Sequence, residues 1–156
     1  MFYMTFDEQT FLFIIWSQGR VAEQRILDDL RRNLTVLETR EVSWRKRDFI
    51  VKLSAFYDER NWWKWFKKAI RCGTGPFLAI KVRDESPSFQ THRIGSLVIR
   101  ENHRLIALKD TYRKWAGRKW SVHCSIEAFE TKRQLSLVGM TETPEPQASP
   151  KTCHVC

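Results

Sequence analysis

The sequence lacks an apolar run long enough to cross a bilayer, and it lacks a secretory signal. The apolar stretch of residues 11–16 is far shorter than the roughly 20 residues that a membrane-spanning helix needs. The first ten residues contain acidic side chains and no cationic segment, which is unlike a signal peptide. We therefore expect a cytoplasmic protein with no transmembrane segment, whose four cysteines are reduced thiols.

Glycine-rich nucleotide-binding signatures are also absent. The chain has six glycines, and neither the P-loop nor the dinucleotide-binding fingerprint fits their spacing. The segment Gly73–Pro76 precedes a strand instead of opening a helix, so we interpret its glycines as a stop between two elements. No internal repeat is found, and we assign no metal ligands. Known motifs therefore leave the cofactor unknown.

Basic residues are in clear excess. The chain carries 27 Lys and Arg against 18 Asp and Glu, which gives a formal net charge of +9. Such a field attracts nucleotides, nucleic acids or anionic membranes. A length of 156 residues suits one hydrophobic core, and 7 Trp and 10 Phe predict that this core is bulky. The composition indicates a class of partner and does not identify one.

Apolar patterning predicts strands that alternate with helices. We expect strands at 10–16, 35–43, 77–83, 94–100 and 120–125, and helices at 20–34, 49–57, 61–72, 104–116 and 125–137, with a loop at 84–93. This order predicts an α/β (or α+β) single domain over residues 1–139, with a mixed sheet of about five strands flanked by helices. Residues 140–156, rich in Thr, Glu, Pro and Ser, are predicted to form a disordered tail.

Two strand-to-helix turns are candidate ligand sites, because ligands of open α/β sheets bind where strands end and helices begin. After the first strand, Ser17 and the N–H of Gly19 would bind phosphate oxygens, and Arg20 would add a bidentate contact. After the last strand, His123 is a candidate acid or base, and Ser125, placed to cap the final helix, is a candidate ligand-binding residue. Both turns face one cleft only if the two strands are parallel and close.

A carboxylate from Glu23, Glu127 or Glu130 would orient His123 or hold a divalent cation. A hydrogen-bonded core histidine is the structural alternative for His123. The leading hypothesis is a protein that binds a phosphate-bearing, nucleotide-like ligand, with a phosphoryl or nucleotidyl transferase or a phosphoesterase as the possible enzyme classes. Whether the protein is an enzyme at all stays open at this point.

A noncatalytic nucleic-acid-binding module is the second hypothesis. Its surface would consist of basic side chains interleaved with aromatic ones, namely Lys64, Lys67, Lys68, Arg71, Arg113, Arg118 and Lys119. This interpretation requires exposed tryptophans. Helical spacing instead puts Trp62, Trp65 and Trp115 on buried faces, which favours core packing. A protein-interaction adaptor, in which the charge serves solubility, is the third hypothesis.

The last four residues, Cys153–Cys156, match two short patterns. In a eukaryotic protein, the form C-a-a-X would allow prenylation of Cys153 and tethering to a membrane. The same residues form C-x-x-C, which is typical of metal or redox pairs. Matches of four residues often arise by chance, so neither pattern decides between the hypotheses.

Overall fold

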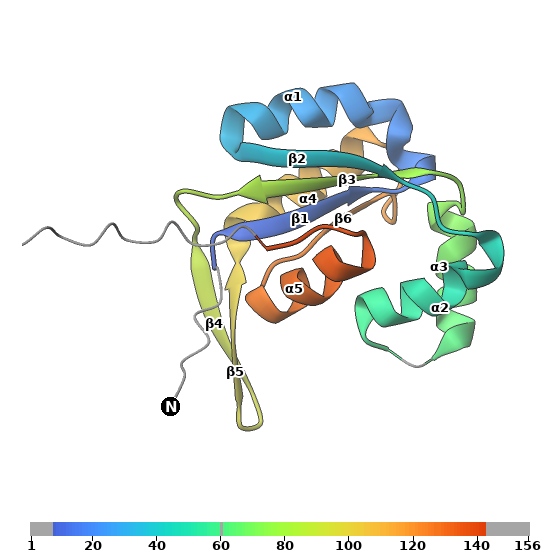
Figure 1. Cartoon of the computed structure of the whole chain (residues 1–156). Helices are drawn as coiled ribbons and strands as arrows, with labels where there is room; N and C mark the ends of the chain where they lie inside the picture. Colours follow the sequence, from blue (N-terminus) through green and yellow to red (C-terminus); the bar gives the residue numbers. More distant parts are fainter. Residues whose placement is uncertain (1–7, 60, 143–156) are drawn as a thin grey trace, which may run out of the picture.

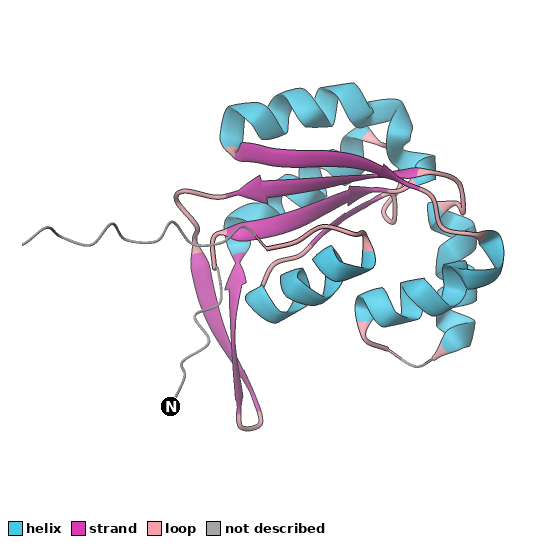
Figure 2. Ribbon diagram, in the orientation of Figure 1, coloured by secondary structure: helices cyan, strands magenta, loops and turns pink. Residues whose placement is uncertain are grey.

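Four antiparallel strands form the central sheet. The structure is a computed structural model that describes residues 8–59 and 61–142. The strands lie in the order β2 (Thr35–Val42), β3 (Phe77–Arg83), β1 (Thr10–Ile15) and β6 (Val122–Cys124), and each neighbouring pair is antiparallel. The central strands β1 and β3 are buried almost throughout. Their apolar runs are continuous because helices cover both faces of the sheet (Figure 1, Figure 2).

Helices pack on both faces of this sheet. One face is covered by α1 (Glu23–Asn33) and α4 (His103–Trp115), and the other by α5 (Ala128–Leu137), α2 (Lys46–Tyr57) and α3 (Trp62–Cys72). In Figure 1, α1 and α5 lie on opposite sides of the sheet, and α2 and α3 lie beyond one end of the strands. The two helical layers separate the core into two clusters, one on each face.

Alternating residues of β1 supply both clusters. Phe13 and Ile15 pack with α1 and α4, whereas Leu12 and Ile14 pack with α2, α3 and α5. This alternation follows from the two-residue period of a strand. Because His123 pairs with Ile14 in the adjacent strand, its side chain belongs to the face of α5 and α2.

A separate hairpin projects from the sheet. It consists of β4 (Phe89–Ile94) and β5 (Leu97–Asn102), joined through Gly95, whose φ of 62° suits a residue without a Cβ. The predicted loop at 84–93 is therefore wrong in part, since β4 occupies its second half. Most side chains of the hairpin are exposed, so it shows little of the apolar alternation by which a half-buried strand is recognised.

The predicted α/β class is confirmed, and the helices lie close to the predicted ranges. The pairing differs, because the sheet has four antiparallel strands instead of about five mixed ones. The predicted last strand is reduced to three residues, and the last helix is capped by Glu127 and not by Ser125.

The packed region extends slightly beyond the predicted domain boundary at residue 139. Met140 is buried, and the carbonyl of Thr141 accepts a hydrogen bond of 3.1 Å from Lys81 Nζ. Residues 143–156, which include Cys153 and Cys156, lie outside the described residues. Within the described part of the chain, no helix combines the length and the apolar character required to cross a membrane.

Candidate functional site

The two predicted turns lie at opposite ends of the β1–β6 pair. These strands are antiparallel, with Ile15 at the end of β1 facing Val122 at the start of β6. The Arg20 guanidinium reaches Glu41 in β2, at the sheet edge remote from β6. The predicted cleft that combines Arg20 with His123 therefore does not form, because it required parallel strands.

Arg20 is held in ion pairs within the protein. Its Nε lies 2.5 Å from Glu23 Oε2, and its Nη1 lies 2.8 Å from Glu41 Oε2. The hydrogen bonds with Glu23 and Glu41 raise the pKa of Arg20 above its ordinary value. A phosphate would have to displace two carboxylates to reach this guanidinium. Arg20 thus links its turn to β2 through Glu41. Glu23, which pairs with Arg20, is not near His123.

The other polar groups of this turn also have partners. The turn is a 3₁₀-helix, η1 (Ser17–Ala22). Ser17 Oγ donates to the Cys72 carbonyl at 3.3 Å, and the Gly19 N–H donates to the Trp16 carbonyl at 2.7 Å. A Cβ at Gly19 would lie 2.7 Å from the Ser121 carbonyl oxygen. Glycine is therefore needed here for close packing between two backbone segments.

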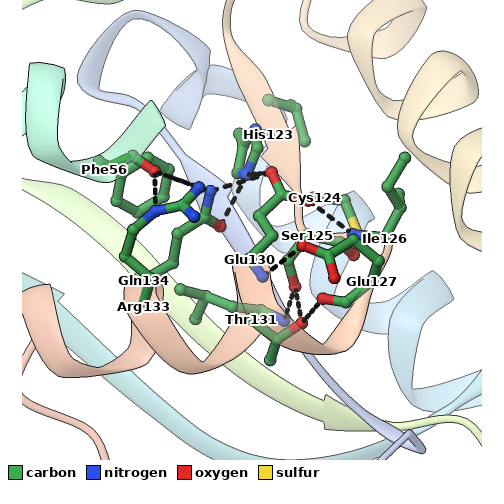
Figure 3. A network of polar contacts seen from close by, with 12 residues as sticks. Phe56, His123, Cys124, Ser125, Ile126, Glu127, Glu130, Thr131, Arg133 and Gln134 are labelled. Atoms are coloured by element: carbon green, nitrogen blue, oxygen red, sulfur yellow. Dashed lines mark hydrogen bonds and ion pairs between the residues drawn. The ribbon is translucent and has the colours of Figure 1, made fainter. Parts of the chain in front are cut away.

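His123 is held by a glutamine that the sequence analysis did not identify. His123 Nε2 lies 2.9 Å from Gln134 Oε1 (Figure 3). The amide nitrogen of Gln134 donates to the Phe56 carbonyl at 3.2 Å and to Glu130 Oε1 at 3.0 Å. Because both of these neighbours are acceptors, Gln134 must present its oxygen to the imidazole. His123 therefore carries its proton on Nε2, and the lone pair is on Nδ1.

Glu130 is the predicted carboxylate that the structure places beside His123. Its Oε1 lies 3.5 Å from His123 Nε2, and its Oε2 accepts a hydrogen bond of 3.1 Å from the Ile126 N–H. Burial raises the pKa of Glu130 above its ordinary value. Gln134 follows Glu130 by four residues, so the two share one helical face. That spacing was the signal available in the sequence for Gln134.

The remaining predicted residues near the last strand have structural roles. Glu127 caps α5 and accepts hydrogen bonds from the N–H groups of Phe129 and Glu130. Ser125 Oγ is buried and accepts from the Leu12 N–H and the Thr131 hydroxyl, each at 2.8 Å. Neither side chain therefore contacts the imidazole of His123 or presents a group for a ligand.

His123 is neutral at physiological pH. Burial lowers the pKa of His123 to about 3, the hydrogen bond with Gln134 partly opposes this, and the positive charge of Lys68 adds to it. The rings of Phe56 and Tyr57 pack edge-on against the imidazole, with centroid distances of 5.1 and 5.0 Å. The site thus combines a neutral imidazole, a fixed tautomer and aromatic walls.

A basic and aromatic pocket adjoins this histidine through Tyr57. It has a volume of about 490 Å³ and is lined by Tyr57, Glu59, Lys64, Trp65, Lys67, Lys68, Arg71 and Trp120. The Tyr57 ring stacks on Trp65 with a centroid distance of 4.9 Å and an interplanar angle of 8°. Four of the predicted basic residues of α3 therefore surround a concave site and not a flat surface.

Lys68 lies over the inner wall of this pocket, which we call the α3 pocket. Its Nζ is 3.3 Å from the Tyr57 ring centroid and 5.2 Å from the centroids of Trp65 and Trp120. Among the described residues, no carboxylate forms an ion pair with Lys68, whereas Lys64 pairs with Glu59 at 2.7 Å. Burial lowers the pKa of Lys68 to about 8.

The other basic residues of the nucleic-acid hypothesis lie outside the lining of the α3 pocket. Arg113 Nε donates to the Val122 carbonyl at 2.9 Å, and Arg118 is exposed. Lys119 Nζ lies 5.6 Å from the Trp120 ring, at the margin of the α3 pocket. The predicted burial of Trp65 is confirmed. In contrast, Phe66 and Ile70 of the same helix are exposed.

The fold has a counterpart among solved structures. A nucleoside diphosphate kinase from Aquifex aeolicus aligns with 83% of this chain and 94% of its own, with a TM-score of 0.53 and 14% identity. The chain is similar in fold to this kinase. No family model and no curated protein matches the sequence. At 14% identity the likeness concerns the fold, and the chemistry has to be argued from the residues of this chain.

The depressed pKa of His123 predicts a pH-dependent stability. In the unfolded chain His123 takes up a proton near its ordinary pKa of about 6.5, whereas the folded side chain stays neutral down to about 3. Acidification therefore favours the unfolded state within that window. Between pH 7 and pH 5 we expect His123 to lower the free energy of unfolding by about 2 kcal/mol. Urea unfolding at the two pH values measures this loss.

The variant His123→Gln isolates the contribution of this residue. It should lose about 2 kcal/mol less than the natural protein between the two pH values. Thr91→Ala, which changes an exposed side chain that does not titrate, serves as the control and should leave the loss unchanged. Equal losses in the natural protein and in His123→Gln would show that His123 is protonated in the folded state.

Proposed function

We propose that the protein binds a nucleotide in the α3 pocket and transfers a phosphoryl group through His123. A volume of about 490 Å³ suits a small-molecule site. The lining offers cations for phosphate groups and the partly exposed Trp120 as a surface for a flat ring. The kinase named above is a precedent, from its name, for phosphoryl transfer on this fold.

The observation that carries the proposal is the state of Lys68. An ammonium group that is partly buried without a carboxylate partner lacks the counter-ion that such groups normally have. A phosphate oxygen would supply that counter-ion and restore the charge balance. Lys68 also lies over Tyr57, whose ring meets the imidazole of His123. Phosphate bound at Lys68 would lie one side chain away from His123, which does not itself line the pocket, and attack requires that the Tyr57 ring move aside.

The chemistry of His123 favours a nucleophile over a general base. A general base works best when its pKa is near the operating pH, and the pKa of His123 is about 3. A neutral imidazole with its proton on Nε2 has its lone pair on Nδ1, and this is the atom that would attack phosphorus once Tyr57 moves aside. Attack would form an Nδ1–P bond and break the P–O bond to the nucleoside diphosphate, which leaves with the electron pair. The ring would then be positively charged, and Glu130, 3.5 Å from Nε2, would stabilise that charge.

Titration calorimetry with ADP, and with inorganic pyrophosphate for the phosphate contacts alone, tests the binding step. Lys68→Met should weaken the binding of both probes by about tenfold or more, because a charge-assisted hydrogen bond contributes roughly 1.5–3 kcal/mol. Lys46→Met removes the same charge from an exposed position outside the pocket and should leave both affinities unchanged.

The same titrations at higher pH provide a second criterion. Because the pKa of Lys68 is about 8, the amine of the free protein loses its proton above that pH. The affinity for ADP should fall between about pH 7 and pH 9, and Lys68→Met should remove this dependence. Binding of a thymidine oligonucleotide that is strongly salt-dependent and insensitive to Lys68→Met would instead support the nucleic-acid module and overturn the proposal.

A further inference from the structure

Three metal-ligating side chains converge where the hairpin meets α4. They are His92 in β4, Glu101 in β5 and His103, the first residue of α4. One ring nitrogen from each histidine and one carboxylate oxygen all lie within 4.8 Å of one another. Glu101 Oε2 is 3.0 Å from His92 Nε2 and 3.7 Å from His103 Nε2.

The register of the hairpin brings these residues together. Glu101 is opposite Gln90, so His92, two residues further along β4, is its diagonal neighbour on the same face. His103 follows Glu101 by two residues, and its N–H donates to the Ser88 carbonyl at 2.8 Å. This bond extends the pairing of β4 and β5 by one residue pair. The side chain of His103 therefore points to the same face of the hairpin as that of Glu101. The backbone itself thus presents all three ligands on one side.

One atom of this cluster lacks a partner. His103 Nε2 is buried, and among the described residues no hydrogen-bond partner is present for it. Its separation of 3.7 Å from Glu101 is too long for a hydrogen bond. Buried polar atoms are nearly always paired, so an orphaned ring nitrogen aimed at a carboxylate and a second imidazole indicates a missing ligand.

We propose that His92, Glu101 and His103 bind a divalent transition-metal ion, with Zn²⁺ as the best match. Two imidazoles and a carboxylate are a known zinc ligand set, whereas Mg²⁺ and Ca²⁺ select oxygen ligands. Bonds of about 2.0–2.2 Å separate tetrahedral ligand atoms by roughly 3.3 Å. The separations from Glu101 Oε2, 3.0 Å to His92 Nε2 and 3.7 Å to His103 Nε2, bracket that value. Rotation of the exposed His92 side chain would bring its ring nitrogen to a similar distance from that of His103.

The metal would connect three elements at a point away from the α3 pocket. It would join both strands of the hairpin to the beginning of α4, and three protein ligands leave a fourth position open. None of the three residues lines the α3 pocket. The metal-site proposal therefore does not depend on the proposed nucleotide function.

Competition between the full-length protein and a coloured chelator for Zn²⁺ tests this proposal. The other possible ligands near the chain end are first removed by Cys153→Ser, His154→Ala and Cys156→Ser. In this background His92→Ala and His103→Ala should each weaken Zn²⁺ binding by at least about tenfold. Acidification should release the ion, since protons compete for the imidazole nitrogens.

Two control measurements distinguish Zn²⁺ binding at this cluster from Zn²⁺ binding elsewhere on the protein. Thr91→Ala alters an exposed neighbour on the opposite face of the hairpin, and it should leave Zn²⁺ affinity unchanged. In ¹⁵N spectra of the unsubstituted chain, Zn²⁺ should shift the ring nitrogens of His92 and His103 but not those of His123. Zn²⁺ binding that is insensitive to His103→Ala, or the absence of shifts at both histidines, would overturn the proposal.

Discussion

Replacement of His123 by alanine is expected to abolish phosphoryl transfer while nucleotide binding persists. The imidazole is the proposed acceptor of the phosphoryl group, and removal of a nucleophile lowers turnover by at least about three orders of magnitude. The α3 pocket does not include His123 among its lining residues, so the affinity for ADP should hold within about twofold. Transfer of radiolabelled phosphate from ATP to the protein, followed by acid treatment, measures both the extent and the acid lability of the label.

Gln134 provides the control for positioning. Gln134→Met keeps the length of the side chain but removes the oxygen that accepts the His123 Nε2 proton. The fraction of the Nε2–H tautomer should fall in ¹⁵N spectra, and the label should form more slowly without being lost. A label that survives in His123→Ala would place the nucleophile elsewhere and contradict the proposed role of His123.

Replacement of Trp16 by alanine is expected to cause the largest loss of stability. The Trp16 ring is fully buried in an aromatic cluster, with centroid distances of 4.7 Å to Phe77, 5.7 Å to Phe56, 6.0 Å to Trp44 and 6.2 Å to Phe49. Removal of a buried tryptophan costs about 3–5 kcal/mol, because it leaves a cavity that the packed neighbours cannot fill. Urea unfolding followed by circular dichroism measures the loss.

Two further tryptophan variants define the cause. Trp16→Phe keeps an aromatic ring in the cluster and removes only part of the buried volume. We expect Trp16→Phe to cost less, about 1–2 kcal/mol. Trp63 is 54% exposed, and Trp63→Ala should change stability by less than about 0.5 kcal/mol. Equal losses for Trp16→Ala and Trp63→Ala would contradict the described core.

Local patterns predicted the elements whose burial is regular. The apolar runs of β1 and β3 were recognisable because both faces of these strands are covered, so polar residues are excluded from nearly every position. The helix α3 ends where predicted, before Gly73, whose φ of 80° an L-residue rarely adopts. The exposed β4 had no such pattern, because a strand without a buried face is under little constraint on polarity.

The candidate site, too, was predicted only in part from the sequence. The sequence placed His123 at the end of a strand and Glu130 on the following helix, and these two residues are close in space. It did not predict that Gln134 holds the imidazole, because four-residue spacing shows that two side chains share a helical face but not which of them meets the strand. The link between His123 and Lys68 through Tyr57 spans three elements, and no local spacing encodes it.

By itself, the sequence determined the elements, the α/β class, the basic character and the chemical types available for a phosphate-bearing ligand. These properties depend on residue identity and on periodicity along the chain. Only the tertiary structure decided that β1 and β6 are antiparallel, which separates Arg20 from His123. It alone brought His92, Glu101 and His103 to one face of a hairpin. Strand direction and register arise from contacts between distant segments, and because such contacts depend on how whole faces pack together, they leave no periodic signal in the chain.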